Sequence, residues 1–201
     1  MNERLAALFV LLSMGLVVGC DRGEGRTSPT AAQAEVPDTA AAAGAPRTAT
    51  TVLPDRTNNA WALTPFKLRG LDGRLHTLDE WKGKVIMMNF WASWCAPCQY
   101  EIPEFVDYQK RYGDKGLQLI GIGVDEQRKL ANVARSLHIN YPVLVLEPSA
   151  ARPLMARWGN DTGIIPYTVI IDRDGTIRYI HRGTFDHEAF QTYVEPLLKK
   201  P

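Results

Sequence analysis

The stretch that decides the fold runs from Lys84 to Cys98 and has the sequence KVIMMNFWASWCAPC. Within it, Val85 to Trp91 is a short, nearly continuous apolar run, which is typical of a strand buried on both faces of a sheet. Two cysteines separated by two residues follow, and a helix is expected from about Ala96 to Tyr112, ending near Gly113. The sequence therefore places a Cys-X-X-Cys pair at the junction between a buried strand and a helix.

Further elements are expected on both sides of this junction. Gly70-Leu71-Asp72-Gly73 predicts an N-terminal β-hairpin, and Asp172-Arg173-Asp174-Gly175 predicts a second one. Strands and helices alternate between them, which indicates an α/β domain with a central mixed β-sheet flanked by helices. The other expected strands are Leu63 to Arg69, Arg74 to Leu78, Leu117 to Val124, Pro142 to Leu146, Tyr167 to Ile171 and Thr176 to His181, and the other expected helices are Gln127 to His138 and His187 to Lys199.

The start of the chain has the character of a secretion signal. Leu5 to Val18 is an apolar run behind Arg4, and it falls short of the roughly 20 residues that a membrane-spanning helix needs. Val17-Val18-Gly19-Cys20 resembles the bacterial lipobox, in which the cysteine is acylated and becomes the first residue after cleavage. Residues 1–19 are therefore expected to be a lipoprotein signal peptide. An ordinary cleaved signal and a buried amino-terminal helix are the alternatives.

A change of composition follows Cys20. Residues 21–60 are rich in Ala, Thr, Pro and Gly and contain no aromatic residue, so they cannot bury enough apolar surface to offset the entropy of ordering. Residues 20–60 are expected to be a lipidated flexible tether, and residues 61–201 one domain. In enteric bacteria, an aspartate directly after the lipidated cysteine is associated with retention in the inner membrane. Asp21 therefore favours a periplasm-facing location at that membrane.

Composition and charge exclude several classes of protein. The 201 residues include 23 Lys and Arg against 22 Asp and Glu, so no net field attracts the chain to nucleic acid. Three cysteines cannot form a disulfide framework, and 13 Pro with 16 Gly do not make a collagen. No nucleic-acid partner is expected, and the protein is expected to be a monomer.

The Cys-Ala-Pro-Cys motif carries the chemistry. A helix amino terminus offers unpaired N–H groups and a partial positive charge, which lower the pKa of a thiol there and favour the thiolate. Cys95 is therefore the expected nucleophile, and Cys98, one turn further, would resolve the mixed disulfide. Half of a zinc site and a structural disulfide are the alternatives, but no other cysteine of the domain supplies a second pair of zinc ligands. Four histidines are scattered and are expected to be surface or hydrogen-bonded residues: His76, His138, His181 and His187.

Three segments, taken in order, resemble the TlpA/ResA kind of thioredoxin-fold protein. They are Lys84 to Cys98, Glu101-Ile102-Pro103, and Gly163 to Thr168 (GIIPYT) ahead of Ile171 to Gly175 (IDRDG). Such proteins are membrane-tethered, extracytoplasmic thiol-disulfide oxidoreductases, some of which reduce apocytochrome c. The resemblance implies a thioredoxin-like fold with an N-terminal β-hairpin and a βα insertion. It also implies protein disulfide substrates, such as apocytochrome c or a metallochaperone, and a membrane electron donor of the DsbD/CcdA kind.

The resemblance assigns roles to single residues. It makes Pro166 a cis-proline that faces the cysteines and exposes the backbone of Ile165 for strand-like pairing with a substrate peptide. Glu101 stands where this family carries a carboxylate close to the redox pair, and burial would let it accept and return the proton of Cys98. A solvated glutamate in the first helical turn is the alternative. The residues expected to contact substrate are Trp94, Ala96, Pro97, Ile165 and Pro166. No metal or cofactor is expected beyond the redox-active Cys95–Cys98 disulfide.

The chain departs from related patterns at two places. Cytoplasmic thioredoxins keep a buried aspartate six residues before the first cysteine, where this chain has Asn89, which cannot carry a proton. The proton relay is therefore expected to fall to Glu101. The loop from Trp158 to Gly163 is about one residue longer than the common form.

Two other functions stay open beside a disulfide reductase. Copper(I) favours thiolates, so a metallochaperone-like copper-binding module is one, although relatives of that kind commonly have a wider cysteine spacing and an added histidine. A thiol peroxidase is the other, but its pattern has Thr or Ser and Pro where this chain has Ala92 and Met88. The absence of a long helical insertion before Pro166 counts against an oxidase of the DsbA kind. The sequence does not predict the direction of electron flow.

Overall fold

The computed structural model describes residue 60 and residues 66–199. The expected signal peptide at 1–19, Cys20 and all of the expected tether except Ala60 lie outside the described residues. Ala60 is buried, and its backbone N–H donates a hydrogen bond to the carbonyl oxygen of Gly175 at 2.6 Å. In the described part of the chain, none of the helices has the length and apolar character needed to cross a bilayer.

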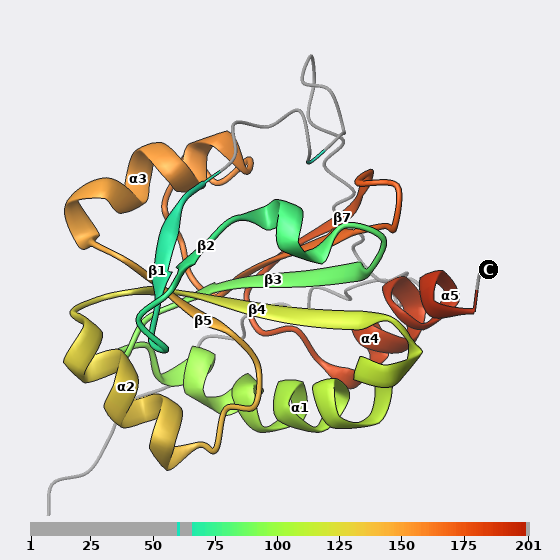
Figure 1. The fold of residues 1–201 in the computed structure, drawn as a ribbon, viewed down its shortest axis with the longest axis horizontal. Coiled ribbons are helices and arrows are strands. Elements are labelled where there is room, and N and C mark those ends of the chain that lie inside the picture. The colour runs from blue at the N-terminus through green and yellow to red at the C-terminus, as the bar shows by residue number, and fades with distance from the viewer. Residues whose placement is uncertain (1–59, 61–65, 200–201) are drawn as a thin grey trace, which may run out of the picture. The chain divides into compact units, whose positions relative to one another are not determined.

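A seven-stranded mixed sheet forms the centre of the domain, in the order β2-β1-β5-β4-β3-β6-β7 (Figure 1). The three middle strands β5, β4 and β3 pair in parallel, and all other pairs are antiparallel. This confirms the expected α/β architecture with a mixed sheet and an N-terminal hairpin. The strands are β1 Leu68–Gly70, β2 Leu75–His76, β3 Val85–Trp91, β4 Leu117–Val124, β5 Val143–Leu146, β6 Tyr167–Ile171 and β7 Ile177–Arg182.

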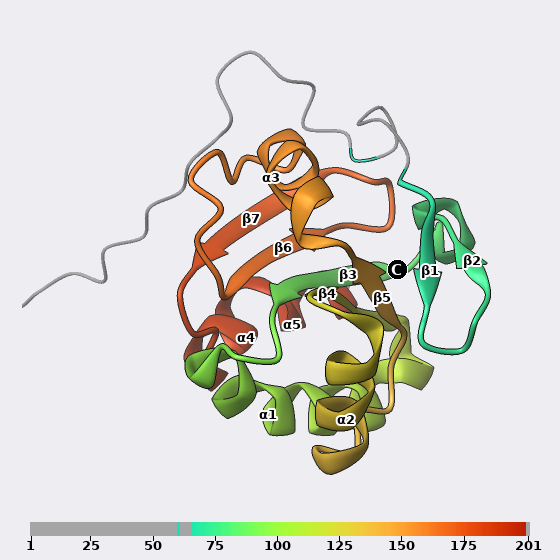
Figure 2. The ribbon, with the colours of Figure 1, turned by 90° about the vertical axis from the view of Figure 1, so that its left-hand side faces the viewer.

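Helices cover both faces of the sheet. In Figure 2, α1 and α2 lie on one side of it and α3 on the other. The α-helices are α1 Ala96–Tyr112, α2 Gln127–Ser136, α3 Pro148–Arg157, α4 His187–Tyr193 and α5 Glu195–Leu198, and the 3-10 helices are η1 Leu78–Trp81 and η2 Gly113–Lys115. The helix α3 was not predicted from the sequence.

The central strand β3 shows why the decisive run is apolar. All seven of its residues are buried. Ile86, Met88 and Phe90 pack in one cluster with residues of α3, whereas Val85 and Met87 pack in another with residues of α1 and α4. Because successive side chains of a strand point to opposite faces, both layers of helices fix the position of β3. The redox motif therefore follows a strand that is packed on both faces.

Several expected elements have other limits in the structure. Residues 66 and 67, expected in the first strand, precede β1, and α2 ends at Ser136 rather than at His138. Two further differences have a clear physical cause. The single helix expected from His187 to Lys199 is divided into α4 and α5, because Pro196 lacks an N–H and its ring clashes with the carbonyl four residues earlier. Leu78, expected at the end of a strand, instead begins η1. There the Glu80 carboxylate accepts a hydrogen bond from the backbone N–H of Thr77 at 3.0 Å, an arrangement that starts a helical turn.

Candidate active site

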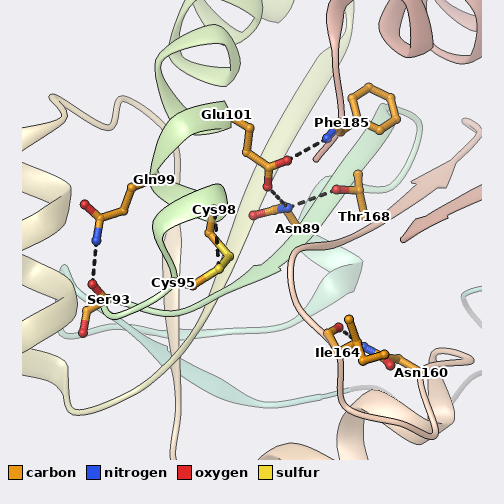
Figure 3. The surroundings of a disulfide bond; sticks show 10 residues. All are labelled: Asn89, Ser93, Cys95, Cys98, Gln99, Glu101, Asn160, Ile164, Thr168 and Phe185. Carbon is orange, nitrogen blue, oxygen red and sulfur yellow. Dashed lines mark hydrogen bonds between the residues drawn. A yellow bond between two sulfur atoms is a disulfide. The ribbon is translucent and has the colours of Figure 1, made fainter. Parts of the chain in front are cut away.

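Cys95 and Cys98 lie at the first turn of α1 and are joined by a disulfide (Figure 3). Cys95 is the N-cap residue, and its Sγ accepts a hydrogen bond from the backbone N–H of Cys98 at 3.3 Å. Pro97 stands in the first turn, where a backbone N–H has no partner within the helix, so it costs no hydrogen bond. The free N–H groups and the helix dipole at this end favour the thiolate form of Cys95 once the disulfide is reduced.

The two sulfur-bearing residues differ in access to solvent. Cys95 is 5% exposed, whereas Cys98 is completely buried. Trp94 beside them is 70% exposed, and Ala96 and Pro97 are also exposed. Of the two residues, only Cys95 therefore has a part that solvent can reach, and it lies beside the exposed Trp94, Ala96 and Pro97.

The proline loop lies against the cluster that contains both cysteines. The Ile165–Pro166 peptide bond is cis. Ile165 is half-buried and packs against the cluster that contains both Cys95 and Cys98. Pro166 is buried, and its carbonyl oxygen accepts a hydrogen bond from the N–H of Gly183 at 3.0 Å. The structure thus brings together two parts of the chain that lie about 70 residues apart.

Glu101 is buried on the next turn of α1 after Cys98, so the alternative of a solvated glutamate is wrong. Its Oε1 accepts a hydrogen bond from Asn89 Nδ2, and its Oε2 accepts one from the backbone N–H of Phe185, each at 2.8 Å. Burial raises the pKa of Glu101 to about 7, although both hydrogen bonds act in the opposite direction. The carboxyl group therefore binds its proton up to a higher pH than an exposed glutamate does.

Asn89 does more than replace an aspartate. Its Nδ2 donates to Glu101 Oε1 and also to Thr168 Oγ1, at 2.8 and 3.0 Å. One amide group thus connects β3 with α1 and β6 (Figure 3). Sequence reasoning missed Thr168 and Phe185 as parts of the site. Thr168 pairs directly with Asn89 in the sheet register, whereas Phe185 contributes a backbone N–H that has no signature in the sequence.

A second polar cluster, also missed from the sequence, holds the turn between β3 and α1. The Ser93 hydroxyl donates to the Asp125 carboxylate, which also accepts the N–H of Glu126 at 2.7 Å. Gln99 Nε2 donates to the carbonyl oxygen of Ser93 at 2.6 Å (Figure 3). Burial alone would raise the pKa of Asp125, but its hydrogen bonds from Ser93 and Glu126, together with the nearby Lys129 ammonium group, outweigh burial and lower that pKa. Hydrogen bonds therefore hold the turn that carries Trp94 and Cys95 to α1 and to the residue that follows β4.

Three of the four histidines make side-chain contacts, and the fourth, His138, is exposed. His76 lies between two carboxylates, with Nε2 at 3.0 Å from Asp72 Oδ2 and Nδ1 at 2.9 Å from Glu80 Oε2. His181 and His187 also have hydrogen-bond partners. Across residue 60 and residues 66–199, the structure has no group of three or more His, Cys, Asp and Glu side chains that could hold a metal ion.

Comparison with known proteins identifies the same chemistry. The AhpC/TSA family pattern matches residues 61–180. The thiol-disulfide oxidoreductase ResA of Bacillus subtilis is 27% identical over 68% of this chain and 73% of its own. The thioredoxin-like protein YneN of the same species is 31% identical over 63% of this chain and 72% of its own.

Solved structures extend this similarity to the fold. A thiol:disulfide interchange protein of the thioredoxin family from Chlorobium tepidum has a TM-score of 0.58 at 30% identity, covering 67% of this chain and 93% of its own. It shares the architecture that places the cysteines at the start of α1. Given the family match over more than half of the chain and the disulfide at the N-cap of α1, the chain belongs to the AhpC/TSA family and is a thioredoxin-like thiol-disulfide oxidoreductase.

Proposed function

We propose that this enzyme is a membrane-anchored, extracytoplasmic reductase of protein disulfides. The observation that carries the proposal is the contrast between the two cysteines. Cys95 is slightly exposed at a helix N-cap beside the exposed Trp94, whereas Cys98 is completely buried on the turn before the protonatable Glu101. This arrangement separates an attacking sulfur from a resolving sulfur, as stepwise exchange requires.

The exchange proceeds in two steps. The Cys95 thiolate attacks one sulfur of the substrate disulfide, so a Cys95–substrate disulfide forms and one substrate thiolate leaves. The Cys98 thiolate then attacks Cys95 Sγ, which forms the Cys95–Cys98 disulfide and releases the second substrate thiolate. Two electrons pass from the enzyme to the substrate, and the two substrate sulfurs end as thiols after taking up protons.

Glu101 serves as the proton acceptor for Cys98. A carboxyl group with a pKa of about 7 can take up the Cys98 proton before the second step and return it when a donor reduces the disulfide again. Asn89 and the N–H of Phe185 hold the carboxyl oxygens in a fixed position during both transfers. The Asn89 amide does not titrate near neutral pH. Of Asn89, Phe185 and Glu101, only Glu101 can therefore accept and return the proton of Cys98.

The location follows from the amino-terminal sequence. Cys20 at the end of the apolar run is acylated, and residues 20–60 tether the domain to the periplasmic side of the inner membrane. There a membrane donor of the DsbD/CcdA kind supplies the electrons, and apocytochrome c is a candidate substrate. Palmitate labelling tests the anchor, and the label should be lost in Cys20→Ala.

The midpoint potential of the Cys95–Cys98 pair tests the direction of electron flow. Equilibration with glutathione or dithiothreitol should give a value near that of thioredoxin, about −270 mV, whereas a value near that of DsbA, about −120 mV, would indicate an oxidase. In cells, Cys98→Ser should accumulate mixed disulfides through Cys95, and the matched variant Cys95→Ser should accumulate none. Equal trapping by both variants would contradict the assignment of the attacking sulfur.

A further inference from the structure

We propose that Asn160 is a positioning residue for substrate recognition. It holds Ile164 outward on the loop whose next residue, Ile165, packs against the cluster that contains the cysteines. The Ile164 side chain favours polypeptide disulfides that carry an apolar residue next to the cysteine. This inference rests on the proposed function, because it concerns which disulfides the reductase accepts.

Asn160 uses its side-chain amide to close the loop before Pro166. Its Nδ2 donates to the carbonyl oxygen of Ile164 at 2.7 Å, and its Oδ1 accepts from the N–H of Gly163 at 3.0 Å and from Thr162 Oγ1 at 3.1 Å. Figure 3 shows Asn160 and Ile164 on the loop beside the disulfide. Asn160 is buried, so these bonds form away from competing water and are costly to lose.

The base of this loop is fixed independently of that amide. The backbone N–H of Asn160 donates to the carbonyl oxygen of Met155 at the end of α3, at 2.9 Å. The Tyr167 hydroxyl donates to the carbonyl oxygen of Trp158 at 2.7 Å, and Arg182 Nη2 donates to that of Gly159 at 3.1 Å. Hydrogen bonds therefore fix the backbone around Asn160, so its side-chain amide can hold the backbone of Ile164 in one place.

The residues between Asn160 and Ile164 have little packing of their own. Asp161 and Thr162 are exposed, and Gly163 adopts φ +72° with no atom within 4 Å of the place a Cβ would occupy. Side-chain packing therefore does not hold this part of the loop. The Asn160 amide, by binding both Gly163 and Ile164, sets the direction in which Ile164 leaves the loop.

Ile164 is a large apolar side chain left in solvent on the proline loop. It is 56% exposed, and the following residue, Ile165, packs against the cluster that contains both cysteines. A substrate whose sulfur reaches Cys95 must pass close to this loop. An apolar side chain next to the substrate cysteine would cover Ile164 and remove apolar surface from water. We expect a substrate with such a side chain to react roughly fivefold to tenfold faster. This advantage is small for an apolar contact, because only the exposed part of Ile164 is newly covered.

Two synthetic peptide disulfides of equal length test the proposal. One has Leu and the other Ser directly after the cysteine, and the measured quantity is the second-order rate constant of their reduction by the reduced protein. The wild type should reduce the Leu peptide roughly fivefold to tenfold faster. Ile164→Ser should bring this ratio close to one. Leu75→Ser is the matched control, because Leu75 is 59% exposed on the edge strand β2, which four other strands separate from β6. This variant should keep the wild-type ratio.

Asn160→Asp tests the positioning role. Its carboxylate can still accept from Gly163 and Thr162 but cannot donate to the carbonyl oxygen of Ile164. We expect the Leu/Ser ratio to fall at least threefold while the midpoint potential of the cysteine pair stays unchanged, which a merely structural loss would not produce. Thr162→Ala removes only one bond to Asn160 and should keep the ratio. Ile164→Ser leaves the Asn160 amide in place and keeps the proposal testable if Asn160→Asp folds poorly.

The outcomes separate this inference from the proposed function. Reduction of neither peptide above the rate of Cys95→Ser would overturn the proposed function, and this inference with it. Reduction of both peptides at equal rates by the wild type would overturn this inference alone. A full wild-type ratio in folded Asn160→Asp would overturn the positioning role of Asn160, and a lost ratio in Leu75→Ser would overturn the role of Ile164.

Discussion

Asn89 Nδ2 donates a hydrogen bond of 2.8 Å to Glu101 Oε1 in the interior of the protein, between the central strand and the helix that carries the cysteines. The bond stabilises the charged form of a carboxyl group whose burial favours the neutral form. The two effects oppose each other, and burial is the larger one. Glu101 therefore titrates near neutral pH, and its proton can be followed through the stability of the fold.

Glu101→Gln should remove a pH dependence of stability. The pKa of Glu101 is raised from 4.5 to about 7 in the folded protein, so in this window the folded state holds a proton that the unfolded chain releases. The contribution of Glu101 to the unfolding free energy therefore falls as pH rises through the window, by on the order of 3 kcal/mol in total. Denaturant unfolding of the oxidised protein at pH 5 and pH 8 measures this decline.

A neighbouring glutamate supplies the control for that experiment. Glu104 is exposed on the same helix, and its charge is only the smallest of the causes that raise the pKa of Glu101. Glu104→Gln should therefore keep most of the decline of the wild type, with its midpoint at slightly lower pH. If Glu101→Gln lost as much stability between pH 5 and pH 8 as the wild type, Glu101 would not titrate in this window.

Asn89→Ala should move the titration of Glu101 to higher pH. The substitution removes a hydrogen bond to the charged carboxylate, so the pKa of Glu101 should rise further. It also leaves Glu101 Oε1 and Thr168 Oγ1 without this partner, at a cost of about 1–3 kcal/mol. The midpoint of the stability decline against pH measures the shift. Thr168→Val keeps the bond from Asn89 to Glu101, so its midpoint should stay near that of the wild type; an equal shift in both variants would contradict the assignment.

The sequence predicted best those parts of the fold in which one local signal dominates. The buried strands β3, β4 and β6 have the predicted limits, because a strand covered on both faces is apolar at nearly every position. The helix α3 was missed because Pro148 and Pro153 resemble loop residues. Pro148 in fact starts the helix, where its missing N–H costs nothing. The buried face of α3, at Ala151, Leu154 and Met155, has helical spacing and was a usable signal.

The residues of the site also differ in how well the sequence predicts them. The cysteines, Glu101 and Pro166 could be predicted because they stand in a compact motif or a recognisable loop. Thr168 became visible only through its register against Asn89, which depends on strand pairing over about 80 residues. Phe185 contributes its backbone N–H to Glu101, and the Asn160 side-chain amide binds the backbone of Gly163 and Ile164. No local sequence signal indicates which backbone atom a buried amide or carboxylate will meet.

His76→Gln should remove a second pH dependence. Burial alone would lower the pKa of His76, but its hydrogen bonds to Glu80 and Asp72 outweigh burial and raise that pKa. The stabilising contribution is therefore complete below about pH 6.5 and is lost as pH rises through the higher folded value. Unfolding measured from pH 6 to pH 9 in the Glu101→Gln background isolates this loss. His138→Asn is the control, because His138 is exposed at φ +52°, which asparagine tolerates. This variant should lose as much stability between pH 6 and pH 9 as the Glu101→Gln background does. If it lost less, the pH dependence would not belong to His76 alone.

Gly123→Ala should destabilise the protein through a steric conflict with Leu130. A Cβ at position 123 would lie 2.6 Å from Leu130 Cδ2 and 2.7 Å from Cδ1, and Leu130 is completely buried in the cluster that contains both cysteines. Overpacking of this kind costs about 1–3 kcal/mol. In the Leu130→Ala background the obstructing methyl groups are gone, so the same substitution should cost at least about 1 kcal/mol less.

The double-mutant cycle makes this steric explanation testable against a general intolerance of glycine replacement. A Cβ at Gly113 would also meet a side chain, Gln109 Nε2 at 2.7 Å, but that atom is the far end of a flexible and partly exposed side chain. Gly113→Ala should therefore cost less than Gly123→Ala in denaturant unfolding. If Gly123→Ala cost the same with and without the Leu130 side chain, the contact between β4 and α2 would not be what requires glycine at this position.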